Sequence, residues 1–177
     1  MAVLPPAPGL RPLAVAFLLA PIGGGPPLPL TRVTPIGGCT PPPGTRVTPF
    51  GGDGGGPFHA RTFGTIGLRT GNYVDQIQLD GRRFGGDGGG DRGSISLEPD
   101  EFITRVDIRS GVYIDNVKFT TSSGRVFGGG GDGGGLQSLV NIQLLAIGGR
   151  AGDYVDNLRF IYLETGSASS QNHEGID

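Results

Sequence analysis

The motif Gly-x-Tyr-(Val/Ile)-Asp occurs three times in this chain, at residues 71–75, 111–115 and 152–156, with starts 40 and 41 residues apart. An aspartate held at a set separation from backbone amides offers acceptors and donors together, and hydrogen bonds to an ionised group are about twice as strong as neutral ones. Hydroxyl groups both donate and accept hydrogen bonds. The motif therefore predicts a site for a polyhydroxylated ligand, and its repetition predicts up to three such sites.

A second motif, Gly-Gly-Asp-Gly-Gly, also occurs three times, at residues 51–55, 85–89 and 130–134. Glycine permits positive φ and lets the backbone approach a ligand closely. These runs therefore offer bare backbone amides that complement the aspartates of the first motif. The two motifs together indicate one supersecondary unit used three times.

The same residues argue against catalysis. A glycosidase needs two carboxylates about 5–9.5 Å apart. Asp153 and Asp156 share one loop, but no glutamate flanks the motif and the other two copies lack the first acid. The two histidines are His59, just after a glycine run, and His173, near the C-terminus. No glycine run is followed by the Gly-Lys-(Ser/Thr) of a phosphate-binding loop. We therefore expect a protein that is not an enzyme.

Calcium is the main alternative ligand for the glycine runs. The segment Gly85–Asp91 is similar to the Gly-Gly-x-Gly-x-Asp repeat of calcium-binding β-helices. Its second aspartate falls one place late, however, and the copies are 34 and 45 residues apart. We therefore expect Asp53, Asp87 and Asp132 to lie in exposed turns, and we expect neither a metal nor another cofactor.

Short β-strands must position both motifs. Apolar residues alternate with others around each Gly-x-Tyr-(Val/Ile)-Asp copy, as at Ile66 and Leu68 before the first copy and at Ile77 and Leu79 after it. This alternation, bounded by glycine turns, is typical of half-buried antiparallel strands. The third copy differs, because residues 148–151 add two residues to its approach. Since one such unit cannot bury a face alone, the pattern predicts an all-β fold with three sheets facing a shared axis.

The two ends of the chain differ from the middle. Residues 1–44 hold most of the prolines and little alternation, which predicts a disordered Pro/Gly-rich leader. Within it, Leu13–Ala20 resembles the apolar part of a signal peptide, but Pro12 opens the segment, so secreted and cytoplasmic locations both stay open. Residues 166–177 are polar and aperiodic, which predicts a disordered tail. The folded domain is expected at residues 45–165.

One segment of the leader is nearly a copy of the start of the domain. Thr31–Gly38 reads Thr-Arg-Val-Thr-Pro-Ile-Gly-Gly, and Thr45–Gly52 reads Thr-Arg-Val-Thr-Pro-Phe-Gly-Gly. Because the later copy runs directly into the first glycine run, we expect it to form the first strand. The earlier copy is then a redundant duplication, with Pro41–Gly44 as a linker.

Charge and cysteine content limit the partners. A formal net charge of -2 gives no reason to expect a nucleic acid as partner. Cys39 is the single cysteine, so the fold must be held by its core rather than by an internal disulfide. No stretch reaches the roughly 18 apolar residues that are needed to span a membrane.

Four segments, taken in order, resemble one known family: Val47–Gly55, Glu101–Val106, Val117–Gly128 and Gly152–Asp156. On these motifs the core, residues 45–165, is similar to the jacalin-related lectins. The resemblance implies the β-prism I fold, in which three four-stranded antiparallel Greek-key sheets surround a pseudo-threefold axis. It also implies that sugar binds at one end, between a Gly-Gly-x-Gly-Gly loop and a Gly-x-x-x-Asp loop.

The resemblance pairs the first glycine run with the last Gly-x-x-x-Asp loop, because the first and last strands are neighbours in this family. Site one would then use the amides of Gly55, Asp153 and Tyr154 and the carboxylate of Asp156, with the Asp153 side chain as a further acceptor. It retains both acidic positions of the family pattern, which makes it the strongest candidate.

Two further sites follow by the same resemblance. Site two would join Gly89 to Asn72, Tyr73 and Asp75, with Asn72 in place of an acid. The tyrosine rings of all three sites are expected either to face the sugar or to pack at the end of the prism, and the aspartates could instead tie their own turns.

Site three would join Gly134 to Val112, Tyr113 and Asp115. Val112 offers an amide but no side-chain acceptor. We also expect Gly128–Gly131 to lengthen the glycine loop of this site, which makes it the weakest of the three.

The partners implied by the resemblance are mannose- or glucose-containing glycans or glycoproteins. The galactose-preferring branch of the family has a free α-amino group just before the first glycine loop, whereas here Phe50 continues into Gly51. A homo-oligomer stays open. The alternative function is a non-catalytic structural or protein-interaction module on the same scaffold.

Overall fold

The structure is a computed structural model that describes residues 44–166. This part of the chain contains twelve β-strands and no helix, and hence no helix there that could cross a bilayer. The leader and the tail lie outside the described residues except for Gly44 and Gly166. The expected disorder of both ends therefore stays a prediction.

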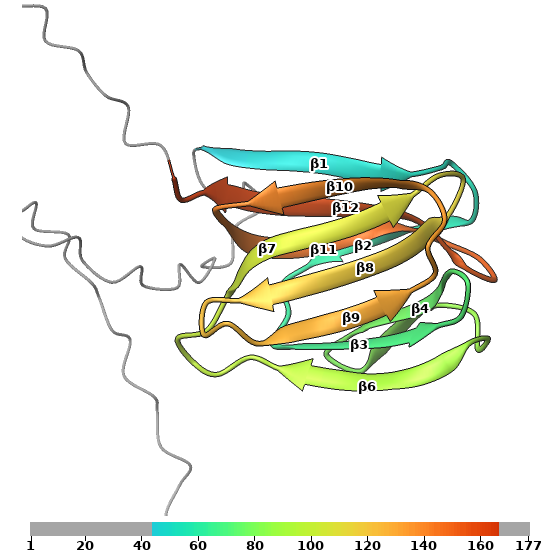
Figure 1. Cartoon of the computed structure of the whole chain (residues 1–177), viewed down its shortest axis with the longest axis horizontal. Helices are drawn as coiled ribbons and strands as arrows, with labels where there is room; N and C mark the ends of the chain where they lie inside the picture. Colours follow the sequence, from blue (N-terminus) through green and yellow to red (C-terminus); the bar gives the residue numbers. More distant parts are fainter. Residues whose placement is uncertain (1–43, 167–177) are drawn as a thin grey trace, which may run out of the picture. The chain divides into compact units, whose positions relative to one another are not determined.

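The first sheet brings the two ends of the domain together (Figure 1). Its strand order is β1 (Thr45–Gly51), β12 (Val155–Glu164), β11 (Ile142–Ala151) and β2 (Gly56–Arg61). The central hairpin β11–β12 therefore lies between the first two strands of the domain, and all pairings are antiparallel. β1 lies in the later of the two duplicated segments, as expected.

The second sheet follows directly in the chain. Its order is β5 (Arg82–Gly85), β4 (Val74–Leu79), β3 (Thr65–Thr70) and β6 (Gly90–Ser96). The hairpin β3–β4 is central, and β6 crosses back to pair with β3. This is a Greek-key connection, in which the fourth strand returns to lie beside the first.

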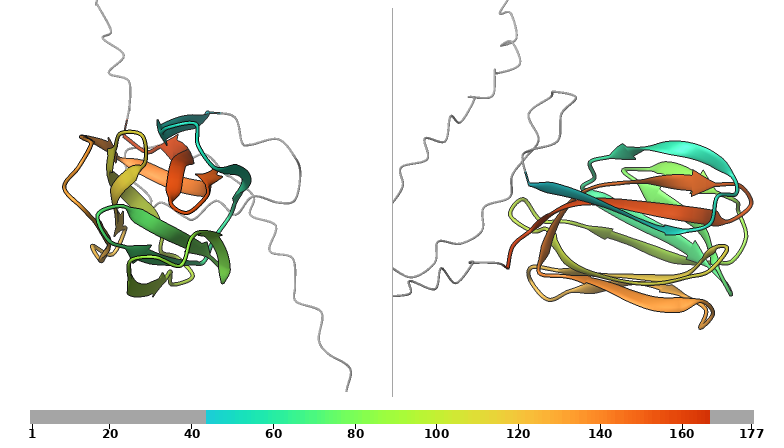
Figure 2. Two further views of the ribbon diagram at one scale, coloured as in Figure 1. Left: turned by 90° about the vertical axis from the view of Figure 1, so that its right-hand side faces the viewer. Right: turned by 90° about the horizontal axis from the view of Figure 1, so that it is seen from above.

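The third sheet repeats the same topology. Its order is β10 (Gly135–Val140), β7 (Ile103–Ser110), β8 (Ile114–Thr121) and β9 (Val126–Gly130). The end-on view in Figure 2 shows the three sheets arranged around a common centre. The prediction of a β-prism built from three four-stranded antiparallel sheets is therefore confirmed.

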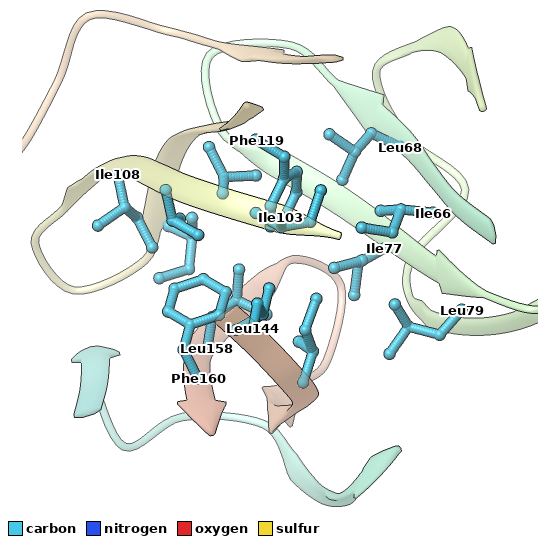
Figure 3. Packing of buried hydrophobic residues seen from close by; sticks show 14 of the residues in the cluster. Ile66, Leu68, Ile77, Leu79, Ile103, Ile108, Phe119, Leu144, Leu158 and Phe160 are labelled. Carbon is cyan, nitrogen blue, oxygen red and sulfur yellow. The ribbon is translucent and has the colours of Figure 1, made fainter. Parts of the chain in front are cut away.

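One hydrophobic core fills the space between the sheets (Figure 3). Its fully buried side chains come from all three sheets and include Ile66, Leu68, Ile77, Ile108, Val117, Phe119, Ile147, Leu158 and Phe160. The rings of Phe119 and Phe160 meet edge to face with their centroids 6.2 Å apart and so join two sheets. Burying a side chain of this size contributes about 1.5–3 kcal/mol. Because each sheet covers the other two, no single unit has a complete core.

The sequence predicts two extra residues at 148–151, next to the Gly-x-Tyr-(Val/Ile)-Asp loop of the third repeat. The structure shows no insertion at this place, so the prediction is wrong. Arg150 pairs with Asn157 just as Arg109 pairs with Asn116, which makes the approach to the motif equivalent in both copies. A register shift between Leu144 and Ala146 lies far from the loop. Gly149 takes the place of an apolar residue because a Cβ there would lie within 3.0 Å of the backbone of Asn157.

Candidate functional site

Both repeated motifs form loops at the same end of the prism, which we call the loop end. It is the right-hand end in Figure 1 and faces the viewer in the left panel of Figure 2. The glycine runs connect β1 to β2, β5 to β6 and β9 to β10, and the Gly-x-Tyr-(Val/Ile)-Asp loops connect β3 to β4, β7 to β8 and β11 to β12. The antiparallel topology thus gathers six loops from distant parts of the chain.

Site one brings the first glycine run against the last aspartate. A Cβ placed on Gly54 would lie within 3.0 Å of Asp156 Oδ1, and one on Gly55 would lie 2.5 Å from Asp156 Oδ2. Gly55 has a φ of +62°, which side chains rarely tolerate. The backbone amide of Gly52 donates to the carbonyl of Asp156 over 2.9 Å and anchors the loop. Glycine is therefore required here by close approach as well as by conformation.

Site two has the same arrangement. Cβ atoms placed on Gly88 and Gly89 would each lie within 3.0 Å of a carboxylate oxygen of Asp75. The amide of Gly86 donates to the carbonyl of Asp75 over 3.0 Å, which anchors this loop as in site one.

Site three repeats the contacts, with Gly133 and Gly134 against the Asp115 carboxylate and the Gly131 amide donating to the Asp115 carbonyl over 2.9 Å. Its loop is not lengthened, contrary to expectation. β9 continues through Gly130, so the connection to β10 is residues 131–134, as short as 86–89 in site two. The additional glycines lie inside β9, where a Cβ on Gly128 would collide with the backbone of Val117.

The three aspartates are almost fully buried. Their relative exposures are 6% for Asp75, 7% for Asp115 and 6% for Asp156. Oδ2 of Asp75 is buried and has no hydrogen-bond partner. A buried polar atom normally has a partner, so Asp75 holds an acceptor that the described residues leave unsatisfied.

The second residue of each motif lies against the glycine loop of a neighbouring site. A Cβ placed on Gly86 would lie 2.5 Å from the carbonyl oxygen of Asp153, and one placed on Gly52 would lie 2.5 Å from that of Val112. A Cβ placed on Gly131 would lie within 3.0 Å of the carbonyl oxygen of Asn72. The side chains of Asp153, Asn72 and Val112 are exposed. The six loops therefore form a closed ring in which each site is braced by the next.

The three tyrosines lie together at the centre of this ring. The ring centroids of Tyr73, Tyr113 and Tyr154 are 5.2–5.3 Å apart, at interplanar angles of 55–65°. Edge-on and tilted contacts at this distance are favourable for aromatic pairs. Each tyrosine is half-buried. The rings thus pack against one another and hold the three motifs around the axis.

One arginine in each repeat holds the glycine loop, and this role was missed in the sequence. Arg150 donates from Nε to the Gly54 carbonyl over 2.9 Å and from Nη2 to the Gly55 carbonyl over 2.8 Å. Arg69 makes the equivalent bonds to Gly88 and Gly89, both over 3.0 Å. The signal was present, because an arginine precedes the first glycine of every motif copy by two positions.

Arg109 completes this set in site three. Its Nη1 donates to the carbonyls of Asp132 and Gly134 over 3.2 and 3.3 Å, which are longer bonds than those of Arg150. An amide side chain directly after the aspartate adds a second anchor: Gln76 donates to the Gly86 carbonyl over 3.0 Å and Asn116 to the Gly131 carbonyl over 3.1 Å. These residues were also missed, although they recur in the sequence.

The residues considered for other chemistry are exposed to solvent. Asp53, Asp87 and Asp132 are exposed in the glycine loops, and His59 is exposed on β2. Within residues 44–166 no three His, Cys, Asp or Glu side chains gather as metal ligands would. The arrangement offers hydrogen-bond acceptors and donors for a neutral polar ligand.

Comparison with known proteins agrees with this description. Residues 47–161 match the family profile of the jacalin-like lectin domain. Griffithsin from Griffithsia sp. is 44% identical over 75 residues, a match that covers 42% of this chain and 60% of griffithsin. The matched part therefore spans less than two thirds of that relative.

Two solved structures have the same fold at low sequence identity. A Malaysian banana lectin superposes with a TM-score of 0.58 at 23% identity, over 68% of this chain and 99% of the lectin. A mannose-binding jacalin-related lectin from Ananas comosus superposes with a TM-score of 0.57 at 22% identity, over 68% of this chain and 99% of the other. With the family profile covering most of the described residues, the chain belongs to the jacalin-like lectin family.

Proposed function

We propose that this protein binds mannose- or glucose-containing glycans at the loop end, through sites one, two and three, and catalyses no reaction on them. The observation that supports this most directly is the contact between a buried aspartate carboxylate and the backbone of a glycine loop, which recurs at all three sites. Membership of a lectin family supports the same conclusion.

A pyranose fits these groups chemically. The Asp156 carboxylate accepts hydrogen bonds from two neighbouring hydroxyls, while the amides of Gly55, Asp153 and Tyr154 donate to their oxygens. Charge-assisted hydrogen bonds of this kind are stronger than neutral ones. Since the sugar is uncharged, it can enter without the desolvation cost of an ion.

Among the residues expected to contact the sugar, the three sites differ in one side chain, which ranks them. Site one has Asp153 as an additional acceptor, site two has Asn72 and site three has Val112, whose side chain is 72% exposed and apolar. Because the loops have equal length in all three sites, this side chain rather than loop length sets the order. Site one binds most tightly and site three least.

The preference for mannose or glucose rests on the continuity of β1. Phe50 and Gly51 are joined within this strand, so no chain end lies beside the first glycine loop. A mannose-binding description of the Ananas comosus lectin, which shares the fold, points the same way. A single site should bind a monosaccharide with roughly millimolar affinity, about -4 kcal/mol, and several sites on one prism end should gain about 100-fold on branched glycans.

The test is retention of the full chain on immobilised mannose and its elution by free mannose. Asp156→Ala should weaken retention most among the single aspartate variants, followed by Asp75→Ala and then Asp115→Ala. Asp100→Ala is the matched control, because Asp100 is exposed in the connection between β6 and β7, at the other end of the prism.

If the wild type is not retained on mannose or glucose, or if all four variants are retained equally, the proposal is wrong. That result would favour the alternative, a structural or protein-interaction module on the same scaffold.

A further inference from the structure

A pocket at the end of the prism opposite the loop end has no role in the proposed function. Its volume is about 380 Å³, and its walls include two arginines, Arg61 at the end of β2 and Arg82 at the start of β5. Thr62 and Asp80 are further polar residues of its wall. Because β2 and β5 are edge strands of different sheets, the pocket lies where two sheets meet.

Aromatic stacking holds these two edge strands together. The rings of Phe58 on β2 and Phe84 on β5 are stacked, with their centroids 4.3 Å apart and an interplanar angle of 13°. β2 leads away from the loop end and β5 leads back to it. Arg61 follows Phe58 by three positions, and Arg82 precedes Phe84 by two. The stacked pair therefore places both arginines at the same end of the prism.

Both arginines occupy core-facing positions of their strands. Arg61 is paired with Ile147, which is fully buried. Arg82 is paired with Leu79, which is also buried. Residues directly opposite each other in an antiparallel pair lie on one face of the sheet. A register shift between β2 and β11 lets Phe58 and Arg61 share this face although they are three positions apart. The chain thus places two cations where most core-facing positions are apolar.

Neither arginine has an anionic partner among the described residues. The Nε of Arg61 is buried and has no hydrogen-bond partner, although buried polar atoms normally have one. Within residues 44–166, neither Arg61 nor Arg82 takes part in an ion pair. In contrast, Arg69, Arg109 and Arg150 all donate to carbonyls of the glycine loops. The Arg61 guanidinium therefore retains a donor that the described fold does not use.

Asp80, the acid of this pocket, is engaged with the backbone. Its Oδ1 accepts hydrogen bonds from the amides of Gly64 and Thr65 over 2.9 and 2.8 Å, and its own amide donates to the Thr65 carbonyl over 3.0 Å. Asp80 and Gly81 have φ values of +50° and +77°, as in a two-residue hairpin turn. Asp80 thus ties the β2–β3 connection to the β4–β5 turn, next to both arginines. Two arginines against one aspartate leave the pocket with an excess of positive charge.

We propose that this pocket binds an oxyanion, the sulfate or phosphate group of an esterified ligand. A guanidinium group is a rigid fork of N–H donors that forms charge-assisted hydrogen bonds with such oxygens. Arg61, Thr62 and Arg82 offer donors from three segments of the chain, and a tetrahedral group has oxygens in several directions. Ligand pockets measure about 300–1,000 Å³, so there is room for the carrier of the anion as well. This inference does not depend on the proposed function, because it uses none of the residues of sites one to three.

The alternative role of the two arginines is protection of the sheet edges. Inward-pointing charges on edge strands prevent sheets of different molecules from pairing. Protection requires only charge, however, and explains neither the unpartnered Nε of Arg61 nor the pocket beside it. It also predicts that sulfate and phosphate do not bind.

NMR titration of the isotope-labelled full chain tests the proposal. Sodium sulfate and sodium phosphate are added at an ionic strength that sodium chloride keeps constant. Each should cause saturable shifts of the Arg61 Nε–H signal and of the amides of residues 62–65 and 80–82, with a dissociation constant of roughly 1 mM. Galactose 6-sulfate and galactose 6-phosphate then show which ester binds more tightly. Galactose itself is the neutral control and should not shift these signals.

Substitution of single arginines separates the pocket from net charge. Arg61→Gln and Arg82→Gln should each raise the dissociation constants about tenfold, because each removes charge-assisted hydrogen bonds. Arg83→Gln is the matched control, since it removes the same charge from the next position on β5 and alternation places it on the other face of the sheet. It should leave the constants unchanged. Arg61→Lys retains the charge but lacks the fork, and should raise the constants about threefold.

The amide spectrum of each variant shows whether it is folded, and exposed Arg82 provides the test even if Arg61→Gln does not fold. Absence of saturable shifts with both ions and both esters would overturn the proposal and favour edge protection. Equal weakening by Arg83→Gln, or equal shifts with galactose, would also overturn it. Retention on immobilised mannose is a separate measurement, so failure of the proposed function is distinguishable from failure of this proposal.

Discussion

Two buried carboxylates at opposite ends of the prism, those of Asp75 and Glu101, have different surroundings. At the loop end, Asp75 is buried with one oxygen that has no hydrogen-bond partner. At the other end, Glu101 is equally buried but accepts hydrogen bonds from Arg125 Nε over 2.9 Å and from the Glu98 amide over 3.1 Å, with further short contacts from Arg125 Nη2 and Ser123. Asp80, also at that end, accepts from the amides of Gly64 and Thr65.

This difference separates stability from binding. A buried carboxylate that is fully hydrogen-bonded holds its neighbours in place, so removing it leaves donors unsatisfied. A buried carboxylate with a free oxygen stabilises the fold less but can accept from a ligand. We infer that the loop end retains its acids for the ligand, while the other end retains them for the fold.

The strongest test of this difference between the two ends is to remove all three aspartates of the loop end. The combined variant Asp75→Ala, Asp115→Ala and Asp156→Ala should lose at least about 100-fold in affinity for a branched mannose oligosaccharide, because every site loses its charged acceptor. Its thermal midpoint should stay close to that of the wild type. Calorimetric titration and thermal unfolding measure the two properties, and a large loss of stability with retained binding would contradict the comparison.

Glu101→Gln should show the converse behaviour. Loss of the charge-assisted bonds from Arg125 should lower the free energy of unfolding by about 2 kcal/mol, roughly a 30-fold change in the unfolding equilibrium. Urea unfolding at pH 7 measures it. Affinity for mannose should be unchanged, and a parallel loss of affinity would show that the two ends are not independent.

Acid should reduce the stabilising effect of Glu101. The hydrogen bond from Arg125, opposed by burial and assisted by bonds from Ser123, Thr121 and the Glu98 amide, holds the pKa of the Glu101 carboxyl far below its usual range. A lowered pKa in the folded state contributes stability above the unfolded pKa of about 4.3, and this contribution is lost as the pH falls toward the folded pKa. The stability difference between wild type and Glu101→Gln should therefore lose nearly all of its roughly 2 kcal/mol between pH 7 and pH 3. A constant difference would contradict this prediction.

The arginine that holds the glycine loop should have the smallest effect. Arg150→Ala removes two hydrogen bonds to the loop of site one and should weaken mannose binding there about threefold, because the amides lose their fixed position. The measurement needs a background of Asp75→Ala and Asp115→Ala, so that site one is observed alone. Arg159→Ala, an exposed position on β12, is the control and should leave affinity unchanged.

Most of the fold could be predicted from local patterns, but several features of the site could not. Alternation around Ile66 and Ile77 predicts strands directly, because side chains alternate between the two faces of a sheet. The role of Arg150 is not apparent from spacing, since the carbonyls that it contacts lie almost a hundred residues earlier in the chain. The glycines of β9 illustrate the same problem: Gly128 looks like part of a loop, yet it lies in a strand because neighbouring backbone leaves no room for a side chain.

The repeats by themselves determined that three similar units exist and that each brings a glycine loop and an aspartate, because both features depend on local conformation and periodicity. Tertiary structure decided which glycine loop meets which aspartate. Site one forms only because β1 pairs with β12, so that the start and the end of the domain share a sheet. Tertiary structure also decided which acids are satisfied, because a hydrogen-bond partner such as Arg125 reaches Glu101 only after two connections far apart in sequence meet at the same end of the prism.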